Sequence, residues 1–128
     1  RVRSSAASDV YKRQLWRYAM PEREDTYQVI VSKRAAHQLA NQAAFVARLD
    51  ERLAHSLVKE FNEAAQSLQR FPYRYPAIRS AEFVTDKYRK MVFNKRYILI
   101  YQIKGETVYI EFVIDGRQDY QWLLNSPE

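Results

Sequence analysis

The chain has 128 residues, of which 47% are hydrophobic and 28% are charged, with a formal net charge of +6. This composition is typical of one globular domain and excludes a disordered chain. Because cysteine is absent, disulfides and thiolate metal sites are excluded and a cytoplasmic location is favoured, and no apolar run reaches the roughly 18–20 residues of a membrane span.

Residues 1–19 differ in composition from the rest of the chain. Residues 3–8 are small and polar, and they show neither a helical nor a strand period. Residues 1–19 hold five basic side chains against one acidic side chain, so they contribute +4 of the net charge. We interpret them as a non-native or disordered extension, with a basic arm that binds nucleic acid as the alternative. Residues 20–128 then form a single domain.

The first half of that domain predicts one strand and two helices. Residues 26–31 are rich in β-branched and aromatic types, which favours a strand. Ser32 is a suitable N-cap for a helix over residues 33–49. Asp50 separates this helix from a second one, whose apolar residues recur at i, i+3 and i+4 until Pro72 ends it. The short joint predicts an antiparallel helical hairpin.

Residues 71–86 predict an irregular connection that is longer than usual, and long loops are often functional. The alternative is that the aromatic side chains of Phe71, Tyr73 and Tyr75 cover one edge of the core. We favour this second interpretation.

Three further strands are predicted over residues 88–93, 97–103 and 108–114, with a turn at Asn94-Lys95 between the first two. The last of these strands alternates, which predicts one face formed by Val108, Ile110, Phe112 and Ile114. The only two glycines, Gly105 and Gly116, fall at turns, where we expect positive φ angles.

A short helix over residues 118–124 is expected to dock Trp122 and Leu123 on the sheet. The predicted order is therefore β-α-α-β-β-β-α. This is an α+β fold in which a helical hairpin packs on a small, mostly antiparallel sheet.

This order of elements resembles the RelE/ParE superfamily of type II toxin–antitoxin toxins, and most closely its ParE-like plasmid stabilization branch. The resemblance covers about residues 26–124. It is carried by the two amphipathic helices and by the segments YQVIVS (27–32), YR (88–89), RYILIYQI (96–103) and IDGRQDYQWLL (114–124). It implies a cytoplasmic toxin that a cognate antitoxin neutralises.

The superfamily contains two activities between which the residues help to choose. RelE-like members cut mRNA on the ribosome, whereas ParE-like members inhibit DNA gyrase. Cleavage by the 2′-OH needs a base, positive charge on the phosphorane and an acid. By the resemblance, Arg89 and Arg117 occupy basic positions of RelE-like enzymes, but Met91 and Ile98 replace two others. Tyr120 lies only near the position of the C-terminal tyrosine.

We therefore expect a toxin that inhibits gyrase and is not an enzyme. The first alternative is a ribosome-dependent mRNA endonuclease that uses Arg89, Arg117 and Tyr120 as catalytic residues. The second is a degenerate, non-toxic relative that only binds a partner. His37 and His55 lie on the predicted helices, where we expect both to be solvated surface residues.

Basic residues predict a partner-binding surface. Five of them fall within ten residues, and together with Arg117 they form a positive surface for an acidic antitoxin segment or a nucleic-acid phosphate. The set comprises Lys87, Arg89, Lys90, Lys95, Arg96 and Arg117. The alternative is a solvated edge that discourages aggregation. For Arg117 an ion pair with Asp119 or Glu111 is equally favoured, and Asp115 and Asp119 are expected to cap the last helix. No motif for a metal or cofactor is present, so we expect neither.

Overall fold

The structure is a computed structural model that describes residues 26–78 and 87–117. Its elements, in chain order, are β1 (Gln28–Val31), α2 (Lys33–Ala47), α3 (Glu51–Ser67), the short 3₁₀ helix η2 (Pro72–Arg74), β2 (Arg89–Phe93), β3 (Tyr97–Lys104) and β4 (Thr107–Asp115). One strand, two helices and three strands follow one another as predicted. The expected helix over residues 118–124 and the expected extension over residues 1–19 lie outside the described residues.

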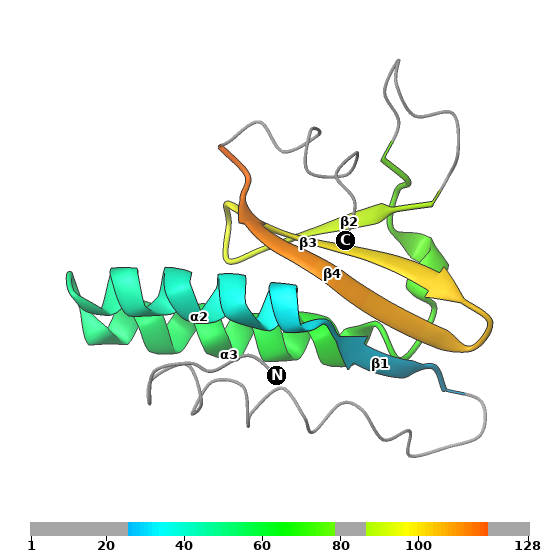
Figure 1. Ribbon diagram of the computed structural model, residues 1–128, viewed down its shortest axis with the longest axis horizontal. Helices are drawn as coiled ribbons and strands as arrows, with labels where there is room; N and C mark the ends of the chain where they lie inside the picture. The colour runs from blue at the N-terminus through cyan, green and yellow to red at the C-terminus, as the bar shows by residue number, and fades with distance from the viewer. Residues whose placement is uncertain (1–25, 79–86, 118–128) are drawn as a thin grey trace.

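The four strands form one sheet in the order β1-β4-β3-β2. β1 pairs with β4 in parallel, whereas the other two pairs are antiparallel, so the prediction of a mostly antiparallel sheet is confirmed. Figure 1 shows the hairpin of α2 and α3 lying along one face of the sheet. β3 is a central strand with six of its eight residues buried, as expected for a strand that is covered on both faces.

The predicted caps fix where both helices begin. The Oγ atom of Ser32 accepts a hydrogen bond from the N–H of Ala35 at 3.0 Å, and Oδ1 of Asp50 accepts one from the N–H of Arg52 at 2.9 Å. The helices then present apolar stripes to the sheet. The almost fully buried side chains of this core include Leu39, Leu57, Phe61, Leu99 and Tyr101.

β4 contains a β-bulge at Glu111 that its sequence pattern does not reveal. The register on β3 shifts by one residue there, so Glu111 is paired with no residue of that strand in the backbone register. Val108 and Ile110 belong to the core under the helices, whereas Phe112 and Ile114 belong to the apolar cluster on the other face. The prediction of one continuous apolar face was therefore wrong, because a bulge adds one residue to a period of two.

Side chains of α2 replace the strand that β4 lacks beyond the bulge. β1 reaches only residues 107–110 of β4. Farther along, the N–H of Val113 donates to Oε1 of Gln38 at 2.8 Å, and its carbonyl accepts from Nε2 of Gln42 at 3.0 Å. Because buried backbone groups need partners, these two glutamines continue the hydrogen bonding of the sheet and attach α2 to it.

The two glycines are required for different reasons. Gly105 has a φ of +61°, as predicted for a turn. Gly116 does not have a positive φ, so that part of the prediction was wrong. A Cβ atom there would lie 2.7 Å from the carbonyl oxygen of Arg96, which accepts a hydrogen bond from the N–H of Gly116 at 2.7 Å. Gly116 therefore permits the close approach of two backbone segments.

Candidate functional site

β2 ends the strand order, so one of its edges faces away from the sheet. The connection before it covers part of this edge. The N–H of Ile78 donates to the carbonyl of Tyr88 at 2.8 Å, and the N–H of Lys90 donates to the carbonyl of Pro76 at 3.2 Å. Since backbone groups alternate in direction along a strand, the N–H and C=O of Val92 also point outward. Within residues 26–78 and 87–117 they have no partner, and Val92 is 58% exposed.

A groove of about 580 Å³ lies between α3 and β2. Buried or half-buried apolar side chains line it from Ala64, Met91 and Phe93, and the exposed charged residues Lys59 and Glu63 border it. A groove with an apolar lining and charged walls of both signs fits an amphipathic peptide segment. It lies beside the outward edge of β2, so one extended partner can contact both.

Arg89, like Arg117, was predicted both as a catalytic and as a partner-binding residue. Its side chain binds other parts of the same domain. Its Nη1 atom donates to the carbonyl of Tyr75 at 2.6 Å and to that of Tyr73 at 3.2 Å. Its guanidinium also lies 5.1 Å from the centre of the Tyr73 ring. Arg89 is half-buried and holds the connection between α3 and β2 against the sheet.

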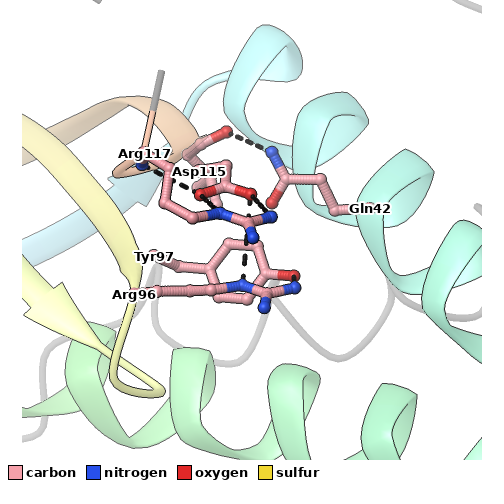
Figure 2. A network of polar contacts seen from close by, with 6 residues as sticks. Gln42, Arg96, Tyr97, Asp115 and Arg117 are labelled. Atoms are coloured by element: carbon pink, nitrogen blue, oxygen red, sulfur yellow. Dashed lines mark hydrogen bonds and ion pairs between the residues drawn. The ribbon is translucent and has the colours of Figure 1, made fainter. Parts of the chain in front are cut away.

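Arg117 lies at the end of β4 in a network with Asp115 (Figure 2). Its Nη2 and Nε atoms contact the two carboxylate oxygens of Asp115 at 2.8 and 3.2 Å. Arg96 lies 4.0 Å from the same carboxylate and donates to the hydroxyl of Tyr97 at 3.3 Å. The ion pair expected for Arg117 is present, but its partner is Asp115. Glu111 pairs with Arg34 instead, and Asp119 lies outside the described residues.

Replacing Arg117 by Ala is expected to raise the pKa of Asp115. The hydrogen bond from Arg117 lowers that pKa below its ordinary value of 3.8, against the opposing effect of burial. A lowered pKa in the folded state stabilises the fold above the unfolded pKa, and the stabilisation disappears as the pH falls through the folded value.

At pH 7 the melting temperature of Arg117→Ala should therefore be slightly below that of the wild type, and the difference is small because exposed ion pairs contribute little. At a pH below the pKa of Asp115 in both proteins, the two melting temperatures should be equal. NMR titration of the Asp115 carboxyl checks this. Arg96→Ala serves as the control and should shift the pKa less, since its contact is longer. An Asp115 pKa that is the same in all three proteins would contradict the assignment.

The predicted basic surface divides into two groups. Lys87, Arg89 and Lys90 lie where β2 begins, whereas Lys95 and Arg96 lie in the turn where it ends. Arg89 lies opposite Tyr101 of β3. Asp115, which binds Arg117, lies opposite Tyr97, four residues away along the same strand. At about 3.3 Å per residue this separates the groups by roughly 13 Å. The structure does not bring Arg89 and Arg117 together, and Tyr120 lies outside the described residues.

The aromatic residues of the connection after α3 differ from expectation. Tyr75 is half-buried, but Phe71 and Tyr73 are 76% and 56% exposed, so the prediction that all three cover the core was wrong for two of them. Tyr101 is fully buried and its hydroxyl donates to the carbonyl of Pro72 at 2.5 Å. Burial raises the pKa of Tyr101 to about 12.

Two histidines and Glu111 are further ionisable residues that the sequence singled out. His55 is exposed and lines the groove, but His37 is half-buried and its Nδ1 atom has no partner in the described residues, so full solvation was wrong for His37. Glu111, which the sequence analysis considered only as a partner of Arg117, is buried and accepts a hydrogen bond from Gln102 at 2.8 Å. A single carboxylate inside an apolar strand was the signal for this role.

An open four-stranded sheet with a helical hairpin on one face is the fold that the resemblance to the RelE/ParE superfamily implied. Residues 29–120 match the family described as "ParE toxin of type II toxin-antitoxin system, parDE". Because this match spans most of the chain, the protein belongs to the ParE toxin family.

A solved structure has a similar fold. It is described as "Chromosomal ParDE TA system from P. aeruginosa", and it superposes with a TM-score of 0.59 at 17% sequence identity. The similarity covers 72% of this chain and 98% of that one. Among proteins with curated descriptions, none matches this chain. No helix in the two described ranges is long and apolar enough to cross a membrane.

Proposed function

We propose that this ParE-family protein is a toxin that inhibits DNA gyrase by binding it and catalyses no reaction of its own. The observation that carries the proposal is the separation of its two candidate catalytic arginines. Arg89 begins β2 opposite Tyr101, whereas Arg117 follows the end of β4 and binds Asp115, which lies opposite Tyr97 at the other end of β3. Each arginine is engaged by groups of the fold itself. Residues that act on one phosphate must lie within hydrogen-bond reach of it.

The ionisable groups described beside the two arginines are also poor bases. The carboxylate of Asp115 has a lowered pKa and is itself bound by Arg117. A tyrosine acts as a base only if its pKa falls, whereas burial raises the pKa of Tyr101, which lies opposite Arg89. His55 lies on α3, where it lines the groove. These observations favour inhibition by binding over cleavage of mRNA.

Two assays on the same preparation test the proposal. The purified protein is expected to block the supercoiling of relaxed plasmid by DNA gyrase and to leave ribosome-bound mRNA intact. Message cleavage that Arg117→Ala abolishes would instead establish the endonuclease activity. Normal growth on induction of folded protein would favour the non-toxic relative.

We further infer that the antitoxin binds the groove and the adjacent edge of β2. An extended antitoxin segment would pair with the outward N–H and C=O of Val92 and place apolar side chains against Met91 and Phe93. The exposed Lys59 and Glu63 then offer charges of both signs to its polar residues. Such a segment folds as it binds, so the preformed edge supplies the register.

A further inference from the structure

Phe71 combines an unfavourable backbone conformation with an exposed side chain. Its φ and ψ are 52° and 53°, the left-handed region in which glycine or asparagine normally follows a helix. For a bulky residue this conformation is an outlier that the surrounding structure must enforce. Its ring is nevertheless 76% exposed, so burial in the core does not explain why a phenylalanine occupies the position.

Groups on both sides of Phe71 hold it in place. Leu68 is fully buried, and Pro72 is buried with its carbonyl bonded to the hydroxyl of Tyr101. Arg74 donates through Nη1 to the carbonyls of Arg70 and Phe71, at 2.5 and 3.0 Å. In Figure 1 this segment forms the short green coil at the end of the sheet. The segment is therefore rigid, and a glycine at position 71 would satisfy its backbone equally well.

Tyr73 adds a second exposed ring two residues farther along the chain. It is 56% exposed, Arg89 lies over its face at 5.1 Å, and Tyr27 contacts it edge-on with ring centres 6.4 Å apart. Its rotational freedom is thus already restricted before any partner arrives. Rigid aromatic side chains next to arginines are the usual centres of protein interfaces, because little entropy is lost when they bind.

Among the described residues, the charged side chains that contact Phe71 and Tyr73 are arginines. Residues 64–78 contain no aspartate or glutamate. Arg74 and Arg89 donate to neutral backbone carbonyls, and no described carboxylate pairs with either of them. These contacts occupy both terminal nitrogens of Arg74 and the Nη1 atom of Arg89, whereas no carboxylate in residues 26–78 and 87–117 neutralises either charge. This arrangement favours an acidic protein surface over a nucleic acid, whose phosphates require available donors.

We propose that Phe71 and Tyr73 form the surface by which the toxin docks on its target, a folded protein with an apolar pocket rimmed by acidic residues. The inference rests on the proposed function, since it presumes that the toxin acts by binding. The rings protrude, so the partner must supply a preformed pocket. An antitoxin segment that folds on binding fills grooves and has no such pocket to offer, which assigns the groove to the antitoxin and the rings to the target.

The test is Phe71→Gly, with Phe45→Ala as a matched control because Phe45 is a 60% exposed phenylalanine on α2. Phe71→Gly removes the ring and the backbone strain together. Its Tm is expected to equal or exceed that of the wild type. Its half-inhibitory concentration against gyrase supercoiling should rise at least about tenfold, as truncation of an aromatic hot spot predicts. Growth arrest on induction should disappear, whereas Phe45→Ala behaves as the wild type.

Further measurements distinguish the possible partners of this surface, and they distinguish the docking surface from the proposal that gyrase is the target. Phe71→Gly should bind the cognate antitoxin as the wild type does. Growth arrest that requires Phe71 without gyrase inhibition would refute the gyrase target and support the docking surface. The inference is overturned if the variant arrests growth like the wild type, if its Tm falls by more than about 5 °C, or if the wild type arrests no growth. It is also overturned if the main loss is binding to the antitoxin or to a labelled single-stranded oligonucleotide.

Discussion

Gly116→Ala is expected to lower the free energy of unfolding by about 3 kcal/mol, in the range of severe steric substitutions. The added Cβ would lie 2.7 Å from the carbonyl oxygen of Arg96 and 3.1 Å from Cδ1 of Ile98. The side chain of Ile98 can adjust. The carbonyl of Arg96 belongs to the backbone immediately before β3, so it cannot move without moving the start of that strand. Moving it away would also break the hydrogen bond from the N–H of Gly116.

Gly105→Ala provides the control, because it separates steric overlap from backbone strain. Nothing lies within 4 Å of a Cβ atom at Gly105, so only the positive φ opposes alanine there, at about 1 kcal/mol. Urea denaturation of both variants measures the difference. If Gly105→Ala proved the more destabilising of the two, the close approach at Gly116 would not be the constraint that we describe.

Local patterns were sufficient to predict most of the fold. The apolar stripe of α3 and the caps at Ser32 and Asp50 each depend on neighbouring residues only. The expected stop at Pro72 was wrong, because α3 already ends at Ser67 with Leu68 as its C-cap. The bulge at Glu111 was not predictable from the alternation, because β4 is apolar both before and after it. The one signal was the carboxylate itself, whose buried bond to Gln102 depends on a strand distant in the sequence.

The candidate site was predicted less well, because closeness in the sequence does not show which residues are close in the folded sheet. Arg89 and Arg96 are close in the sequence, yet an extended strand places them at opposite ends of β2. The exposure of Phe71 was missed for a similar reason. Aromatic residues are usually buried, and the contacts that keep this ring outside come from Arg74 and Tyr101, neither of which has a recognisable motif.

Val92→Pro is expected to weaken binding of the antitoxin by at least about thirtyfold while the toxin stays folded. Proline removes the outward N–H and adds a ring at the point where the partner strand must approach. The substitution does not remove a hydrogen bond of the sheet, because that N–H points away from β3. The melting temperature should therefore change by only a few degrees, and titration calorimetry with the antitoxin measures the loss.

Val92→Thr isolates the backbone effect, since threonine keeps the N–H and the β-branched shape and should bind as the wild type does. Met91→Pro is the opposite control. Its N–H points toward β3, so this variant is expected to lose the pairing with Leu99 and to unfold. If Val92→Pro bound the antitoxin with unchanged affinity, no partner strand would add to this edge. The antitoxin would then have to bind through the groove of α3 alone.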